Sequence, residues 1–228
     1  MFFTKNKEKQ KHEKISYAQC GEDLIIDFVF SLLRIDKPTY LDIGTHHPYY
    51  LSNTAYFYKK ACKGVSVEPD PELFKVIKRE RPDEICLNVG VSEQSGLADF
   101  YIMNVPTLNT FSKKEADRYS SYEGKNIKEI VKIELVNVND IILKKFNDVS
   151  PNFVSIDVEG MDLVILKSFD FKKYRPEVLC IETLSYTENN TEEKLKDIIE
   201  YVESQGYFLY ADTYINSIFV EKEKWKKR

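Results

Sequence analysis

Apolar residues recur along the chain in two alternating patterns, one typical of amphipathic helices and the other of buried strands. In residues 22–34 the apolar side chains follow helical spacing, and a short apolar run at residues 39–43 comes next. The same alternation returns several times and predicts an α/β fold, in which helices cover both faces of a mostly parallel sheet. Seven strands are expected in this sheet, at residues 39–43, 64–68, 85–91, 153–157, 178–183, 207–211 and 217–220, the last two forming a hairpin.

Local signals mark where the helices between these strands begin and end. Asp70, Pro71 and Glu72 predict a helix start, because aspartate caps free backbone amides and proline suits the first turn. Gly206 marks the end of the last long helix, since glycine readily adopts the backbone conformation that terminates helices. The helices expected from spacing and caps lie at residues 22–34, 52–62, 70–81, 139–146, 161–168 and 191–205.

A long insert, residues 92–151, interrupts the alternation before the fourth strand of the expected sheet. It contains a hairpin-like segment at residues 97–103 and a strand-like segment at residues 130–138. Residues 112–129 are polar, with scattered tyrosines and little apolar periodicity, and we expect a loop or a mobile lid there. The chain is therefore predicted to be one domain, residues 1–228, with a basic tail at 1–15, an N-terminal helical segment at 16–38 and the insert.

Composition and charge argue against several classes of protein. With 228 residues, of which 43% are hydrophobic and 31% charged, the chain can form one domain with a sizeable core. A formal net charge of -4 argues against a nucleic-acid binder, whose affinity would come from neutralising phosphates. No apolar run approaches the roughly 20 residues that span a bilayer, and no signal-peptide core follows Met1, so we expect a cytoplasmic protein with no transmembrane segment.

The cysteines and the two ends of the chain indicate no metal or catalytic site. Four cysteines lack the close spacing of zinc ligands and are expected to be reduced, small apolar residues of the core: Cys20, Cys62, Cys86 and Cys180. Basic segments lie near both ends, at residues 5–14 and 222–228. Solvated termini account for most such segments, and weak peripheral contact with an anionic membrane surface is the alternative. The oligomeric state has no signature in the sequence.

Acidic and polar residues stand where the expected strands end. In an open parallel sheet, ligands bind beyond the carboxyl ends of the strands. Few lysines or arginines lie in these loops, and no glycine-rich phosphate loop is present, so a ligand with a cationic centre and hydroxyls is favoured. Glu68, 24 residues after Gly44, is placed to accept hydrogen bonds from a ribose diol, which nicotinamide and S-adenosylmethionine enzymes share. An ordinary solvated strand end is the alternative.

The strongest local signal is the segment Ser155-Ile156-Asp157-Val158-Glu159-Gly160. An apolar strand that ends in two carboxylates is costly unless those charges are solvated, paired or used in the function. Three uses stay open for these carboxylates. They are a general base for a hydroxyl, a divalent-cation site completed by Glu182, and a partner for the positive end of a cofactor.

Several ordered motifs together resemble those of the FkbM family of S-adenosylmethionine-dependent methyltransferases. The resemblance covers residues 16–184. The motifs are Gln19-Cys20-Gly21-Glu22-Asp23, Leu41-Asp42-Ile43-Gly44 with His46 and Ser52-Asn53-Thr54, Val67-Glu68-Pro69, Asn88-Val89-Gly90-Val91-Ser92, the segment 155–160, and Arg175-Pro176-Glu177 with Ile181-Glu182. The resemblance implies a Rossmann-like class I methyltransferase sheet of seven strands, the last antiparallel.

The resemblance also implies where S-adenosylmethionine binds and what it methylates. The loop after Asp42 and Gly44 is expected around the methionine part, Glu68 at the ribose hydroxyls, and residues 88–92 near the adenine. The expected cofactor residues are Asp42, Gly44, Thr45, His46, Asn53, Glu68, Pro69, Asn88, Val89, Ser92 and Asp157. The family typically methylates hydroxyls, often of sugars in surface glycans. His46 and Pro48, which replace two possible glycines, mildly favour a sugar, and residues 92–151 are expected to recognise the acceptor.

Methyl transfer to a hydroxyl needs a base or a cation that lowers the hydroxyl pKa. The candidate catalytic residues are Asp157, Glu159, His46, His47 and Glu182, of which the first two rank highest. Neighbouring residues of an extended loop point in different directions, so at most one histidine should face the reacting centre. Mg²⁺ or Ca²⁺ on the carboxylates is a less favoured alternative, and zinc is disfavoured.

Two other functions remain open at this stage. A nicotinamide-dependent oxidoreductase fits a similar sheet, although the glycine fingerprint is incomplete. A non-catalytic domain that binds a partner would bind neither cofactor.

Overall fold

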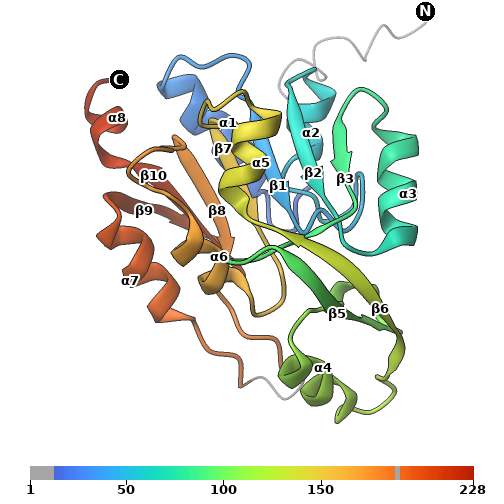
Figure 1. Ribbon diagram of the computed structural model, residues 1–228. Helices are drawn as coiled ribbons and strands as arrows, with labels where there is room; N and C mark the ends of the chain where they lie inside the picture. Colours follow the sequence, from blue (N-terminus) through green and yellow to red (C-terminus); the bar gives the residue numbers. More distant parts are fainter. Residues whose placement is uncertain (1–12, 188–190) are drawn as a thin grey trace, which may run out of the picture.

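The computed structural model describes residues 13–187 and 191–228, and its main sheet has seven strands (Figure 1). Their order is β3-β2-β1-β7-β8-β10-β9. In this sheet β10 alone runs in the direction opposite to the other strands, which confirms the predicted mostly parallel, Rossmann-like sheet. The strands are β1 Tyr40–Ile43, β2 Gly64–Val67, β3 Ile85–Leu87, β7 Phe153–Ile156, β8 Val178–Glu182, β9 Tyr207–Asp212 and β10 Asn216–Glu221. The expected basic tail, residues 1–15, falls mostly outside the described residues.

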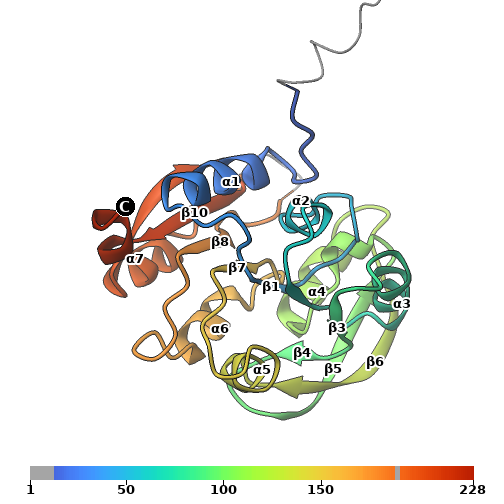
Figure 2. The ribbon, with the colours of Figure 1, turned by 90° about the horizontal axis from the view of Figure 1, so that it is seen from above.

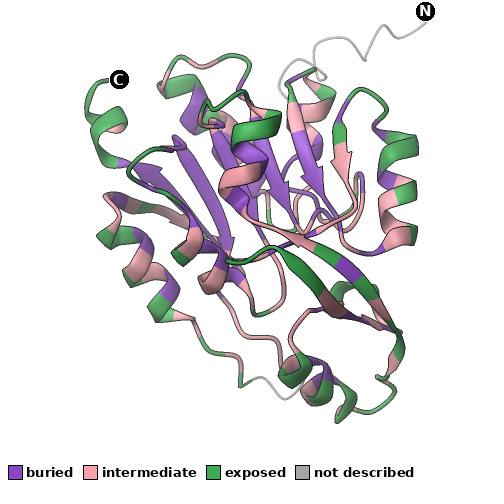
Figure 3. Ribbon diagram, viewed as in Figure 1, coloured by how far each residue is buried: buried purple, intermediate pink, exposed green. Residues whose placement is uncertain are grey.

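Helices cover both faces of this sheet, as predicted (Figure 2). One core cluster joins α1 (Glu22–Leu32) and α2 (Ala55–Lys59) to one face. A second cluster joins α5 (Val138–Lys145), α6 (Asp162–Ser168) and α7 (Lys196–Ser204) to the other. The central strands are buried along their length because their side chains alternate between the two clusters (Figure 3).

Three helix boundaries show how local chemistry sets the chain direction. The predicted cap of α3 (Pro71–Glu80) is confirmed, because Asp70 Oδ1 accepts hydrogen bonds from the Glu72 and Leu73 amides at 2.8 and 3.2 Å. The helix expected at residues 52–62 is only α2, since the residues before it form a loop. The helix expected at residues 191–205 is only α7, because the Leu195 amide instead bonds to the Thr183 carbonyl at 2.9 Å.

The strand expected at residues 85–91 is interrupted after β3, and this part of the prediction is wrong. Asn88 donates from its side chain to the carbonyls of Glu68 and Pro69, both at 2.9 Å, and turns the chain away from the main sheet. The chain then enters a second sheet of order β4-β6-β5, made of β4 Gly90–Val91, β5 Gly96–Met103 and β6 Ile127–Val136. The insert is thus tied to the end of β3.

The segment expected to be a loop or mobile lid, residues 112–129, contains the helix α4 (Lys113–Ser120), so this prediction was wrong. Ser112 caps α4 by accepting a hydrogen bond from the Glu115 amide at 3.2 Å. Ala116 and Tyr119, three residues apart, bury one face of α4 against β5 and the short 3-10 helix η2 (Pro106–Leu108). The second sheet and α4 lie beyond the carboxyl ends of the parallel strands (Figure 1).

Two further observations concern the C-terminal segment and the membrane. The basic segment at residues 222–228 contains a short helix, α8 (Lys222–Lys226). Within residues 13–187 and 191–228, no helix is both long and apolar enough to cross a bilayer.

Candidate functional site

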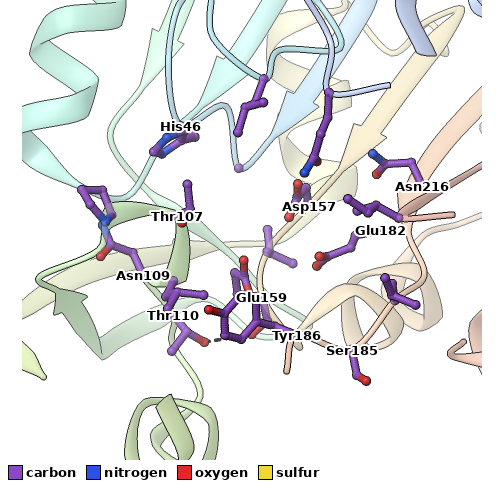
Figure 4. A pocket seen from close by; sticks show the side chains of 18 of the residues that line it. His46, Thr107, Asn109, Thr110, Asp157, Glu159, Glu182, Ser185, Tyr186 and Asn216 are labelled. Atoms are coloured by element: carbon purple, nitrogen blue, oxygen red, sulfur yellow. Dashed lines mark hydrogen bonds between the residues drawn. The ribbon is translucent and has the colours of Figure 1, made fainter. Parts of the chain in front are cut away.

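A cavity of about 430 Å³ lies at the carboxyl ends of the parallel strands (Figure 4). Its floor comes from residues that follow β1, β2, β7 and β8. The second sheet, η2 and the segment before α4 contribute one wall, and the segment after β8 with the β9–β10 turn contributes another. A cavity of this size is typical of a small-molecule or cofactor site.

Gly44 brings the ends of β1 and β7 together. Its φ is +86°, and a Cβ built on it would lie 1.8 Å from the carbonyl oxygen of Asp157. The Asp157 amide in turn donates to the Ile43 carbonyl at 3.0 Å. The contact that requires glycine at position 44 is therefore with the protein backbone, and it places the β1 loop beside the carboxylate segment.

The two histidines of the β1 loop point in different directions, as expected for neighbouring residues of an extended loop. His46 lines the cavity, with a left-handed φ of +57°, and its amide donates to Glu68 Oε2 at 2.8 Å. His47 does not line the cavity; its Nδ1 accepts from the amides of Tyr49 and Tyr50 at 3.1 and 2.9 Å. Burial lowers the pKa of His46 below its ordinary value, so the imidazole is neutral and can accept a proton.

Glu68 stands at the end of β2 with its carboxylate at the cavity. It accepts backbone hydrogen bonds from His46 and Asp70, each at 2.8 Å, and Asn88 holds the Glu68 and Pro69 carbonyls from the other side. Burial raises the pKa of Glu68 to about 8, although both amide donors favour the ionised form. Glu68 and Pro69 therefore form a rigid, acidic wall.

Asp42 lies under the cavity floor and supports the loop rather than lining the cavity. Thr54 donates to its carboxylate, and burial raises the pKa of Asp42 to about 6. Arg81, at the end of α3, is fully buried and binds the same loop through the Pro48 carbonyl and the hydroxyls of Ser52 and Thr54. This network fixes the loop that carries His46 and Asn53.

Three carboxylates meet at the centre of the cavity: Asp157 and Glu159 after β7, and Glu182 at the end of β8 (Figure 4). One oxygen of each lies within 4.8 Å of the others. Burial, together with the neighbouring Asp162, raises the pKa of Asp157 to about 7. Burial and then Asp157 raise the pKa of both Glu159 and Glu182 well above their ordinary values. Carboxyl groups with such raised pKa values keep their protons, and a positive charge bound nearby would lower the pKa values and favour the ionised forms.

The insert holds Glu159 in an unusual backbone conformation. Glu159 has a left-handed φ of +50°, Thr110 donates to its carbonyl at 3.0 Å, and the Tyr119 hydroxyl donates to its carboxylate at 2.7 Å. Thr110 comes from the segment before α4, and Tyr119 lies within α4. The helix that replaced the expected lid is therefore directly connected to the acidic cluster.

The structure places some of the predicted site residues on the cavity and others beside it. Those that line it are Gly44, His46, Asn53, Glu68, Pro69, Asp157, Glu159 and Glu182. Those that do not line it are Asp42, Thr45, His47, Asn88, Val89 and Ser92. Thr45, Asn53 and Asn88 make hydrogen bonds within the floor, to Asp42, Ser155 and the Glu68–Pro69 segment. Ser92 pairs with Val136 in the second sheet.

Sequence reasoning missed the residues that only tertiary contacts bring to the cavity. From the insert these are Phe100, Thr107, Asn109, Thr110 and Phe111; from the C-terminal half they are Ser185, Tyr186, Tyr214 and Asn216. The position of the insert was the only available signal for the first group. The second group follows β8 or lies near the β9–β10 turn, and no motif marked it.

Comparison with known proteins gives one family match and several fold likenesses. Residues 42–209 match the model of the methyltransferase FkbM domain. No curated protein matches the sequence significantly. Among solved structures, the chain is similar to a TehB-like S-adenosylmethionine-dependent methyltransferase from Corynebacterium glutamicum, with 11% identity, 94% of this chain and 92% of that chain covered, and a TM-score of 0.46.

Two other solved structures show a comparable likeness. A putative caffeoyl-CoA O-methyltransferase from Staphylococcus aureus has 11% identity, coverage of 94% and 88%, and a TM-score of 0.45. The O-methyltransferase TomG from Streptomyces achromogenes, solved with S-adenosylmethionine, has 10% identity, coverage of 93% and 85%, and a TM-score of 0.45.

The family match spans most of the chain, including the β1 loop, Glu68 and the carboxylate segment, and it decides between the three functions left open above. The match excludes the two alternatives, a nicotinamide-dependent oxidoreductase and a non-catalytic domain that binds a partner. The chain belongs to the methyltransferase FkbM domain family and is an S-adenosylmethionine-dependent methyltransferase.

Proposed function

We propose that the protein is an O-methyltransferase that acts on a hydroxyl of an uncharged sugar or surface-glycan precursor. The observation that carries the proposal is the cluster of Asp157, Glu159 and Glu182 inside the cavity. Hydroxyls need a proton acceptor at the moment of methyl transfer, and carboxylates at a cavity centre supply one.

The chemistry of the cavity wall fits S-adenosylmethionine. Glu68 offers a buried carboxylate to a ribose diol, and Gly44, His46 and Asn53 form the neighbouring loop surface. None of the described lining residues is a lysine or an arginine, so the cavity suits a ligand that carries positive charge. When bound, S-adenosylmethionine supplies a methyl group on a positively charged sulfur, which makes the carbon electrophilic.

The residues of the chain then position the acceptor and remove its proton. As the acceptor oxygen forms its bond to the methyl carbon, the carbon–sulfur bond breaks, its electron pair stays on sulfur, and the hydroxyl proton passes to a carboxylate. Asp157 and Glu159 are the proposed acceptors of this proton, with His46 as the alternative because its low pKa leaves it neutral. Tyr119 orients Glu159 from α4.

Polar and aromatic side chains on the outer walls favour a sugar. Thr107 and Ser185 offer hydroxyl groups, and Phe111 and Tyr186 offer ring surfaces. Sugars combine hydroxyl edges with apolar ring faces, which these two kinds of side chain match. Because Thr107, Asn109 and Phe111 belong to residues 92–151, we propose that the insert recognises the acceptor, together with the segment after β8.

The test is calorimetry with S-adenosylmethionine and S-adenosylhomocysteine on the wild type and Glu68→Ala, followed by a methyl-transfer screen against neutral glycosides. We expect the wild type to bind both ligands, Glu68→Ala to bind at least about tenfold more weakly, and a glycoside to become O-methylated. A wild type that binds neither ligand would contradict the cofactor part, and methylation of amines alone would contradict the hydroxyl part.

A cytoplasmic location is part of the same proposal. The four cysteines are unpaired, which is the state that a reducing compartment maintains. Cys62 and Cys180 are buried as expected, whereas Cys20 is exposed and so is not a core residue.

A further inference from the structure

We infer that the cluster of Asp157, Glu159 and Glu182 binds a hard divalent cation, with the side-chain oxygen of Asn216 as a fourth protein ligand. The role of this cation rests on the proposed function: with the cation bound, Asp157 and Glu159 are its ligands, and His46 is the residue that accepts the hydroxyl proton. Binding of the cation is a separate property of the cluster and is tested separately. The inference assigns Asn216 to the site, and no sequence motif marked this residue.

The spacing of the carboxylates matches the size of such a cation. Their ligand oxygens lie within 4.8 Å of one another. Three oxygens with such spacing lie at most about 2.8 Å from a common centre, whereas bond lengths to oxygen are roughly 2.3–2.6 Å for Ca²⁺ and roughly 2.0–2.1 Å for Mg²⁺. The cluster therefore accepts a Ca²⁺-sized ion after a small contraction, and a smaller ion such as Mn²⁺ or Mg²⁺ after a larger one.

Asn216 is the independent observation that points to a ligand. It is 2% exposed, it lines the same cavity, and its backbone pairs with that of Glu182 across β10 and β8. Its Oδ1 is buried without a hydrogen-bond partner among the described residues. Figure 4 shows its side chain extending toward Asp157 and Glu182. A buried amide oxygen without a partner is costly, and coordination of a cation would satisfy it.

Glu22 fixes the orientation of this amide. Glu22 is fully buried, and its Oε1 accepts hydrogen bonds from Asn216 Nδ2 at 3.1 Å and from the Thr213 hydroxyl at 2.6 Å. Rotating the amide by 180° would bring its oxygen against the Glu22 carboxyl oxygen and lose the bond. The amino group therefore faces Glu22, and the oxygen is left for a ligand.

The charge of the cavity supports the same conclusion. Three carboxylates meet there, and no lysine or arginine lines the cavity within the described chain. Arg118, on α4, is held by Glu115 and the Tyr186 carbonyl. A divalent cation would neutralise most of the cluster and would lower the pKa of an acceptor hydroxyl bound to it.

The test uses the full chain, freed of metal by a chelator, and Mn²⁺ as the probe, followed by electron paramagnetic resonance of free Mn²⁺. We expect one Mn²⁺ per chain, displaced by Ca²⁺ or Mg²⁺, with binding weakened at least about tenfold by Glu159→Gln and several-fold by Asn216→Ala. Added Mn²⁺ should also raise the melting temperature of the wild type, which shows that the folded chain is the species that binds.

Glu192→Gln is the matched control, because Glu192 lines the same cavity outside the cluster and the substitution removes the same charge. It should change Mn²⁺ affinity less than about twofold. A wild type without Mn²⁺ binding, or an equal loss in Glu192→Gln and Glu159→Gln, would overturn the inference. If S-adenosylhomocysteine still binds in that case, the proposed methyltransferase function stands; if it does not bind, the proposed function fails separately.

Discussion

Gly44 is the residue where the backbone, rather than a side chain, determines the site. Its φ of +86° disfavours any other residue, and its missing Cβ leaves room for the Asp157 carbonyl. We expect Gly44→Ala to destabilise the fold by more than about 3 kcal/mol, because about 1–2 kcal/mol of left-handed strain adds to a backbone clash. Urea denaturation measures this change.

Gly124→Ala separates the cost of left-handed backbone strain from the cost of the clash with the Asp157 carbonyl. Gly124 also has a positive φ, +73°, but a Cβ there would meet nothing within 4 Å. This variant should lose only about 1 kcal/mol, from strain alone. Equal losses in the two variants would show that the contact with Asp157 costs nothing.

Glu68 should make cofactor affinity depend on pH. Its pKa of about 8 means that the carboxyl group is protonated at neutral pH, whereas the ionised form accepts both hydrogen bonds of a ribose diol best. Affinity should therefore rise with pH, and S-adenosylhomocysteine should bind up to about thirtyfold more weakly at about pH 6.5 than at about pH 9. Calorimetry across this range tests the prediction.

The ligand's own amino group also titrates in this range, so Glu68→Gln provides the reference. The variant should retain only the ligand's share of the pH dependence, because glutamine has no proton to lose. The same slope in both proteins would mean that Glu68 does not face the ribose.

At the scale of elements, α3 controls the β1 loop through one buried side chain. Arg81 donates to the Pro48 carbonyl, to two loop hydroxyls and to Glu84. Arg81→Met should cost about 3–5 kcal/mol, because Glu84 keeps a buried charge without its partner. S-adenosylhomocysteine affinity should fall as well, since the loop carries His46. Denaturation and calorimetry measure the two effects.

Arg79→Met is the control on the same helix. Arg79 is exposed, and among the residues that the structure describes its one ion pair is with its neighbour Glu80. Its loss should therefore change stability by less than about 0.5 kcal/mol. Near-normal stability in Arg81→Met would show that the loop is held by other contacts.

For the whole molecule, the acidic cavity should select acceptors by charge. The chain has a net charge of -4, and the cavity adds local carboxylates without a lining lysine or arginine among the described residues. In protein freed of divalent cations, a neutral glycoside should therefore be methylated at least about tenfold faster than its phosphorylated counterpart at low salt, and this rate difference should decrease as salt screens the repulsion. Initial rates at two ionic strengths measure this selectivity.

Glu192→Lys should decrease the difference in methylation rate between the neutral and the phosphorylated glycoside at low salt, because it places a positive charge at the cavity. A phosphorylated acceptor that reacts faster than the neutral one in the wild type would contradict the proposal.

The sequence alone determined the main sheet, most of its helices, and the positions of Glu68, Asp157 and Glu182 at strand ends. These features depend on local patterns: apolar spacing, the Asp70 cap, and a sheet geometry that brings strand ends to one edge. The family resemblance was visible for the same reason, because its motifs lie at those strand ends.

Only the tertiary structure decided what surrounds these residues. The turn at Asn88, the packing of α4 on β5 and the inward position of Asn216 all depend on partners distant in sequence. A loop takes its direction from such contacts, since its own residues have too little apolar periodicity to fix it. For this protein, local pattern therefore determined the fold and the carboxylates, and long-range packing determined the cavity that they share.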